Sequence, residues 1–198
     1  MSKRTLFLIF ALFLINFVLL IIALYTPKSK PTTTQIIPTP EKQIAQTILS
    51  FGNPIIAASS STKSALQTYS LPINIITGKN KATAVQLELQ YDPKVLTSVS
   101  VTPGVFFKNP IVLLNQIDAK TGRISYAFGI SPTQQGIGGQ GIVATLSFES
   151  KTGAPQQTSI IFLPKTLVTA ELISQSALKQ TSNIQLTVGK INSTPSAR

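Results

Sequence analysis

The residues that could do acid–base, nucleophilic or metal chemistry are few. The chain has 198 residues and contains no histidine and no cysteine. A zinc site of the usual ligand types, a cysteine nucleophile and a Ser-His-Asp triad are therefore excluded. Any catalysis would have to use the six carboxylates, which are Glu41, Glu88, Asp92, Asp118, Glu149 and Glu171.

These carboxylates are scattered singly along the chain. No two of them have the spacing that would place both on one face of a strand, whereas a glycosidase needs a pair that converges on one bond. We therefore predict that the chain is not an enzyme, and we expect no metal site and no cofactor.

A glycine-rich stretch from Gly136 to Gly141 fits the G-x-G-x-x-G pattern of dinucleotide-binding turns. That chemistry requires a helix after the glycines and an acidic residue about 20 positions further on. The residues that follow, IVATLSFES, instead alternate between apolar and polar as a strand does. We interpret the glycines as a loop between two strands.

The positive charge is spread along the chain. The net charge is +11, and Lys79 and Lys81 form the closest basic pair after Gln43. Nucleic-acid binders concentrate their charge on one face and often interleave aromatic residues, and this chain does neither. We therefore expect no nucleic-acid partner and a general attraction to acidic partners or anionic surfaces.

An apolar run occupies the N-terminus. From Leu6 to Tyr25 the only polar residue is Asn16, and Lys3 and Arg4 precede the run. About 20 apolar residues are enough to cross a bilayer as a helix. The alternative is a cleaved signal peptide, which would have a shorter apolar region and a small-x-small cleavage site. The run ends in a bulky tyrosine, so we predict an uncleaved transmembrane anchor over residues 1–26.

The anchor sets the predicted location of the rest of the chain. Because the early positive residues usually dominate orientation, we expect the N-terminus inside the cell membrane and the C-terminal domain outside. Residues 27–45 contain four prolines, which favours an extended linker. Residues 46–189 then form the main domain, and residues 190–198 form a polar tail.

The main domain has the pattern of short β-strands. Apolar and polar residues alternate over four to eight positions, and glycine or proline separates the runs. This pattern predicts an all-β sandwich or barrel of eight or nine strands, at residues 47–51, 71–76, 85–91, 99–101, 124–130, 144–148, 159–163, 167–170 and 184–188.

The most informative segment is AVQLELQYDPKVLTSVSVTPG, from Ala84 to Gly104. A strand ends at Tyr91, Asp92 can bond the following turn, and Pro93 cannot extend a strand ladder. Val95 and Leu96 then fold back as a hydrophobic plug before the next strand.

In this order, the motifs resemble those of a cohesin domain, the dockerin-binding β-sandwich of cellulosome scaffolds. The resemblance covers about Gln46 to Gly189 and implies a nine-stranded jelly-roll sandwich. The motif positions that match are Tyr91, Asp92, Pro93, Leu96, Gly104 and Gly141.

The resemblance also implies that the outer face of one sheet docks a partner. On the strand at 124–130, Ser125, Ala127 and Gly129 would point outward and make a flat surface. Such a surface is equally consistent with a docking site and with small exposed residues that have no binding role. The predicted partner-binding residues are Gln86, Glu88, Ser125, Ala127, Gly129 and Ile130.

Three functions remain open at this point. The first is a cell-surface, cohesin-like protein-binding module for an acidic, calcium-binding dockerin-like partner, within assemblies that bind or degrade extracellular polysaccharide. The second is a structural envelope or adhesin sandwich without dockerin binding. The third, least favoured, is an enzyme that uses scattered carboxylates.

Overall fold

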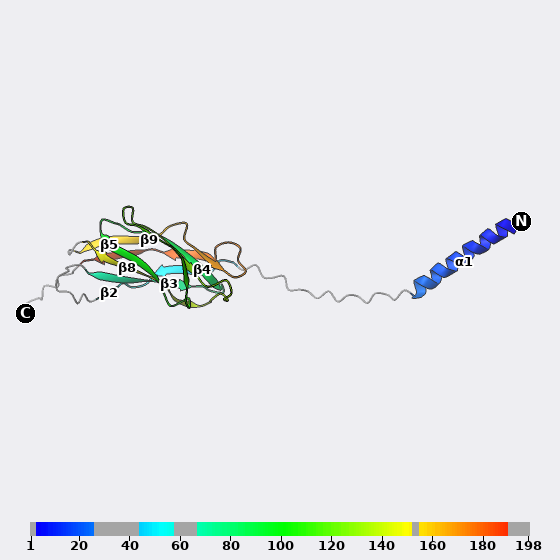
Figure 1. Cartoon of the computed structure of the whole chain (residues 1–198), viewed down its shortest axis with the longest axis horizontal. Coiled ribbons are helices and arrows are strands. Elements are labelled where there is room, and N and C mark those ends of the chain that lie inside the picture. The colour runs from blue at the N-terminus through cyan, green and yellow to red at the C-terminus, as the bar shows by residue number, and fades with distance from the viewer. Residues whose placement is uncertain (1–2, 26–43, 58–66, 152–154, 190–198) are drawn as a thin grey trace, which may run out of the picture. The chain divides into compact units, whose positions relative to one another are not determined.

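The computed structural model describes residues 3–25, 44–57, 67–151 and 155–189. The chain divides into two units, Met1–Glu41 and Lys42–Arg198 (Figure 1). The predicted linker up to residue 43 and the predicted polar tail lie outside the described residues.

The described residues of the first unit form the helix α1 (Lys3–Tyr25). Its described side chains between Phe7 and Ile22 are mainly large, apolar and exposed. Over the described part of the chain, no helix combines the length and hydropathy that a membrane crossing needs. The membrane span from Leu6 to Tyr25 stays a prediction.

In the second unit, the described residues form a β-sandwich of two six-stranded sheets. In the first sheet, the order is β11-β1-β3-β8-β5, with β2 paired to β3, and β5, β8 and β3 are seen beside one another in Figure 1. Its strands are β1 (Thr47–Phe51), β2 (Ile55–Ala57), β3 (Thr68–Ile76), β5 (Leu96–Pro103), β8 (Gln140–Ser150) and β11 (Leu178–Ser182).

The second sheet has the order β12-β9-β4-β7-β6, with β10 paired to β4. Its strands are β4 (Ala82–Gln90), β6 (Ile111–Asp118), β7 (Arg123–Gly129), β9 (Gln156–Phe162), β10 (Leu167–Ala170) and β12 (Ile184–Val188). Strand β6 therefore lies at one edge of this sheet, and β7 lies between β6 and β4.

The prediction of an all-β sandwich is confirmed, but the prediction of nine strands is wrong. The described residues form twelve strands. Each of the nine predicted segments corresponds to a strand, and β2, β6 and β11 are additional. Strand β2 has only three residues, while β6 and β11 lie at sheet edges where few side chains are buried, so none shows a clear alternation.

The core lies between the sheets and is built from alternate positions of each strand. On β7, Ile124, Tyr126 and Phe128 are at most 1% exposed. The Phe128 ring lies 5.9 Å from that of Phe107 and 5.2 Å from that of Tyr126, measured between ring centroids. Because side chains alternate along a strand, burying these three residues turns Ser125 and Ala127 to the outer face.

The glycine-rich stretch is a loop that leads into β8, which confirms its interpretation as an inter-strand loop. The Gly139 N–H donates to Thr77 Oγ1 at 2.8 Å, and the Gly136 N–H donates to the Glu171 carboxylate. Ala82 and Ile137 also exchange two backbone hydrogen bonds. These contacts hold the loop against the β3–β4 turn, the start of β4 and the residue that follows β10.

We predict that Phe128→Ala lowers the free energy of unfolding by about 3–5 kcal/mol, because it removes a fully buried ring and leaves a cavity. Urea unfolding of the full chain, followed by circular dichroism of the strands, measures this change. The control is Val112→Ala on β6, the direct cross-strand partner of Phe128, since Val112 is 45% exposed. Equal losses for the two variants would contradict the assignment of Phe128 to the core.

Candidate functional site

The register between β4 and β7 brings most of the predicted site residues together. Gln86 lies opposite Ala127, Glu88 opposite Ser125, and Ala84 opposite Gly129. These positions alternate with buried ones, so they share the surface that we call the docking face. We define it by the outward positions of β4, β7 and β6, which are Ala84, Gln86, Glu88, Gln90, Arg123, Ser125, Ala127, Gly129, Ile111, Leu114, Gln116 and Asp118.

The predicted residues differ in accessibility. Gln86, Ser125 and Ala127 are half-buried, whereas Gly129 is buried. A Cβ at Gly129 would come within 2.6 Å of the Ala84 Cβ, so β4 and β7 approach too closely there for a side chain. Ile130 follows β7, and its side chain packs against the core.

Glu88 is the most unusual of these residues, because it is an outward-facing carboxylate that is only 4% exposed. Its Oε2 accepts hydrogen bonds from Ser125 Oγ at 2.8 Å and from Arg123 Nη2 at 3.1 Å. Its Oε1 accepts a third from Gln86 Nε2 at 3.1 Å. The contact with Arg123 is also an ion pair. A buried charge is stable only when it is paired and hydrogen-bonded in this way.

The segment before β10 packs along β4 at the same position. The hydroxyl of Thr166 accepts from the Glu88 N–H at 3.1 Å and donates to the Glu88 carbonyl oxygen at 3.0 Å. The Leu163 N–H also donates to that carbonyl at 2.7 Å. These contacts fix the backbone of Glu88 from the segment before β10, while Gln86 of its own strand and Ser125 and Arg123 of β7 hold its carboxylate.

The hydrogen bonds decide the charge state of Glu88. Burial, the largest single influence, would raise its pKa, but hydrogen bonds from Ser125, Arg123 and Gln86 and the charge of Arg123 together hold the pKa below its ordinary value. Glu88 is therefore ionised at neutral pH, and its carboxylate holds the side chains of Arg123, Ser125 and Gln86 in place.

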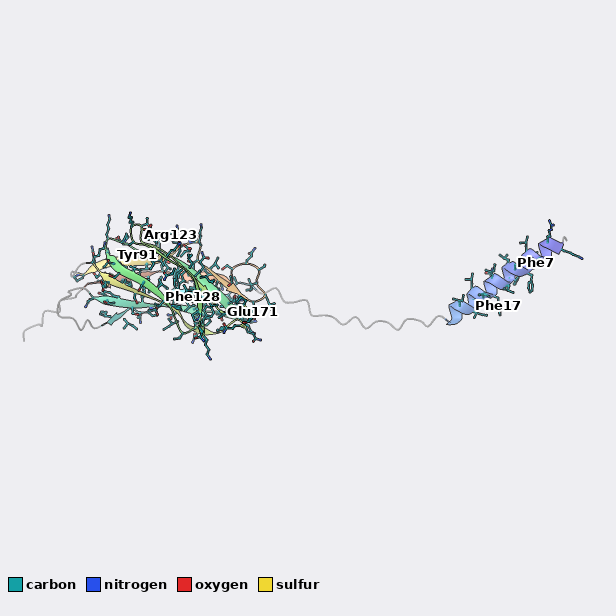
Figure 2. All side chains as sticks on the ribbon, viewed as in Figure 1. Phe7, Phe17, Tyr91, Arg123, Phe128 and Glu171 are labelled. Carbon is teal, nitrogen blue, oxygen red and sulfur yellow. The ribbon has the colours of Figure 1, made fainter. Side chains whose placement is uncertain are left out.

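Sequence reasoning missed Arg123 as a functional residue. It is the first residue of β7, and its side chain is 46% exposed (Figure 2). The only sequence signal was its place after the Thr121-Gly122 turn, two positions before Ser125. Pairing with Glu88 depends on the β4–β7 register, which the sequence alone does not specify.

The predicted Tyr-Asp-Pro motif supports the start of β7. The Asp92 carbonyl accepts from the N–H groups of Val95 and Leu96, at 3.1 and 3.0 Å, which folds the hydrophobic plug back as predicted. The Tyr91 N–H donates to the Gly122 carbonyl at 2.9 Å. Gly122 has a φ of +73°, and a Cβ there would overlap the carbonyl oxygen of Tyr91. The motif thus joins the end of β4 to the turn that precedes Arg123.

The two glycines of the motif, Gly104 and Gly141, lie at the other sheet. The Gly104 N–H donates to the Val143 carbonyl at 2.9 Å, and a Cβ at Gly104 would overlap the backbone of Ile142. Gly141 lies in β8, where a Cβ would come within 3.3 Å of the Phe106 ring. These glycines allow close packing beside β8 and do not contribute to the docking face.

Edge strand β6 adds an apolar border to the docking face. Ile111 lies opposite Gly129 and is 48% exposed, and Leu114 lies opposite Ala127. The register shifts between Val112 and Leu114, and Leu113 at this irregularity is 70% exposed. Sequence reasoning missed this border because it did not identify β6 as a strand.

Comparison with known proteins identifies a family. The family model for the cohesin domain matches residues 56–192. The structure is similar to CaCohA2 from Clostridium acetobutylicum, with 22% sequence identity, a TM-score of 0.54, and coverage of 74% of this chain and 93% of that one. None of the curated proteins matches this chain.

A second similar structure is the third cohesin ScaC from Acetivibrio cellulolyticus, solved in complex with the ScaB dockerin. It has 14% identity, a TM-score of 0.54, and coverage of 73% of this chain and 100% of that one. The cohesin of the Coh-OlpC-Doc435 complex from Clostridium thermocellum has 15% identity, a TM-score of 0.53, and coverage of 76% and 99%. At these identities the likeness shows the fold.

We predict that Glu88→Gln weakens the dependence of the free energy of unfolding on pH at acidic pH. Because the folded-state pKa of Glu88 is lowered, its stabilisation is complete above the ordinary pKa of about 4.3 and is lost as the pH falls through the folded-state value. At pH 7 the variant should lose about 1–3 kcal/mol, since an amide replaces a charged acceptor. Denaturant unfolding of both proteins between pH 7 and pH 3 measures the difference.

The difference in unfolding free energy between the wild type and Glu88→Gln should narrow as the pH falls below about 4.3. A difference that stays constant across this range would show that the pKa of Glu88 is not lowered in the folded state.

Proposed function

This chain belongs to the cohesin domain family, and from that premise we propose that its sandwich is a protein-binding module that docks a dockerin-type partner on the docking face. The observation that carries the proposal is the strip of small side chains on β7. Ser125 and Ala127 are half-buried, and Gly129 has no side chain. On β6 all three lie opposite longer residues, and on β4 Gly129 lies opposite the small Ala84. Such a surface lets the backbone of a partner approach closely.

The carboxylates support a binding role over a catalytic one. Each of the five that the structure describes makes a separate local contact. Glu88 holds the Arg123 pair, Asp118 accepts from Thr121 and Lys120, and Asp92 accepts from the Lys94 N–H. Glu149 accepts from Ser98, and Glu171 accepts from the Gly136 N–H. We propose that the module has no catalytic activity of its own.

Charge favours an acidic partner. The chain has 17 basic and six acidic residues, which gives a net charge of +11. A positive surface speeds encounter with acidic proteins and discriminates against basic ones. A dockerin with acidic calcium-binding repeats has the complementary charge, and we propose that such a protein is the partner.

We further propose that the module is held at the cell surface by α1. The supporting observations are the uncharged run from Leu6 to Tyr25 and the exposure of large apolar side chains around α1, which need an apolar environment. The proline-rich residues 27–45 would then space the sandwich from the bilayer. In this position a docked enzyme would act on extracellular polysaccharide. The alternative is an envelope or adhesin sandwich that binds no dockerin.

We predict that Ala127→Arg weakens dockerin binding by well over tenfold, because it places an unpaired charge at the centre of the docking face. Stability should stay within about 0.5 kcal/mol, since Ala127 points away from the core. The matched control is Ser147→Arg on β8, a small, half-buried residue on the outer face of the other sheet.

The measurement is biolayer interferometry with the full chain in detergent and a panel of calcium-loaded dockerins. If no dockerin binds the wild type, the proposed function fails and the envelope alternative is favoured. If Ala127→Arg and Ser147→Arg bind equally well, the docking surface lies elsewhere.

We predict that the full chain stays in the membrane fraction and that protease added to intact cells digests the sandwich. The physical reason is the length of the apolar run from Leu6 to Tyr25 and the absence of a small-x-small site after it. Immunoblotting for the C-terminus, with a cytoplasmic protein as the protection control, measures this. A secreted soluble form that begins after Tyr25 would show instead that the run is a signal peptide.

A further inference from the structure

The docking face is chemically uneven along β7. Arg123 begins the strand and Gly129 ends it, and Figure 2 labels Arg123 and Phe128 near these two ends. Six residues of extended chain separate the ends, which corresponds to about 20 Å. The side chains that border the two ends differ in charge and polarity.

The end of the face at Arg123 presents hydrogen-bond donors. The structure pairs Nη2 of Arg123 with Glu88, whereas a guanidinium group has five N–H donors, and 46% of the side chain is exposed. Asp118 lies opposite Arg123 on β6, but its carboxylate accepts from Thr121 Oγ1 at 2.7 Å and from the Lys120 N–H at 2.9 Å. Asp118 is thus engaged by its own turn, and its pKa is lowered, chiefly by the Thr121 hydroxyl.

The other end of the face is apolar. Ile111 is 48% exposed opposite Gly129, Leu113 is 70% exposed, and Leu114 lies opposite Ala127. Strand β6 carries no charged residue before Asp118, its last position. Because Gly129 and Ala127 have little or no side chain, Ile111 and Leu114 border a shallow area that aliphatic groups can fill.

From this arrangement we infer that the docking face recognises two features of its partner: a carboxylate that pairs with Arg123, and an aliphatic cluster that packs on Ile111 and Leu114, which lie opposite Gly129 and Ala127. Four to six residues of extended strand separate Arg123 from these positions, which corresponds to about 13–20 Å. The inference rests on the proposed function and names the partner chemistry at that same face. The aliphatic end supplies buried apolar area, and the charged end supplies selectivity, since a partner with a basic residue there would meet Arg123.

Glu88 has a different role from the one that its place on the face suggests. At 4% exposure it presents almost no surface to a partner. Its carboxylate instead fixes the Arg123 guanidinium at 3.1 Å, so Glu88 is a positioning residue and Arg123 is the contact residue. A planar guanidinium held by one carboxylate can still donate to a second from its remaining N–H groups.

The charged end is tested with the double variant Glu88→Gln with Arg123→Gln, which removes both members of the ion pair, so that neither is left without the other. The full chain and the dockerin that binds the wild type most tightly are compared by interferometry at 50 and 300 mM salt. We expect the affinity of the double variant to fall at least tenfold and its salt dependence to become weaker. Glu88→Gln alone should lose less, because Arg123 remains. The control is Lys179→Gln on β11, which removes one exposed charge from the other sheet.

The partner carboxylate is located by a double-mutant cycle. Each Asp and Glu of the dockerin is replaced by its amide and measured against the wild type and against Arg123→Gln, both in the Glu88→Gln background. One of these replacements should lower the affinity when Arg123 is present but not in the Arg123→Gln variant, because that variant has already lost the ion pair between the dockerin carboxylate and Arg123. If no replacement behaves in this way, the assignment of Arg123 to a partner carboxylate is wrong.

The apolar end is tested with Ile111→Ser, and the control is Ile56→Ser on β2, an exposed isoleucine of an edge strand in the other sheet. Ile111→Ser should weaken binding five- to tenfold with an unchanged salt dependence, and Ile56→Ser should not. Equal binding by the two serine variants, or wild-type binding by the double variant, overturns the inference while the proposed function stands. Failure of every dockerin to bind the wild type overturns both.

Discussion

The alternation of side chains along β7 is the constraint on which the rest of the site depends. Ile124, Tyr126 and Phe128 are buried between the sheets, and their burial sets which side of the strand faces outward. A slip of one residue would exchange the two sets and bring aromatic rings to the surface, at the cost of most of their apolar burial. The docking face is therefore specified by the core behind it more than by contacts among its own residues.

The second organising feature is the carboxylate of Glu88, which lies on the outer face of its sheet but is covered by neighbouring side chains. Removing a carboxylate from water is costly, and Glu88 is stabilised there by Ser125, Arg123 and Gln86 and by the Thr166 contacts to its backbone. The same contacts restrict the rotamers of those side chains. A partner then meets groups that are already ordered, so less side-chain entropy is lost when it binds.

The sequence predicted the two-sheet architecture because nine strands alternate clearly between buried and exposed positions. The period of β7 also predicted that Ser125 and Ala127 point the same way. That Gln86 shares their face followed from the resemblance to cohesin domains, which implied that the two strands are neighbours. The sequence did not predict β6, whose edge position leaves Ile111 and Leu113 exposed and removes the alternation. It could not assign Glu88 to a buried ion pair, because that pair depends on register and on the distant segment at Leu163 to Thr166.

The close approach of β4 and β7 at Gly129 limits how this surface can change during evolution. Any side chain at Gly129 would collide with Ala84 and the Thr83 carbonyl, so drift at that position is opposed by the backbone geometry itself. Ala127, two residues earlier, already carries a Cβ at a half-buried outward position, and Ile111 and Leu113 are exposed on an edge strand. A lineage that acquires a new partner would therefore diversify Ala127 and β6 first and keep Gly129, even where every contact with the partner has been replaced.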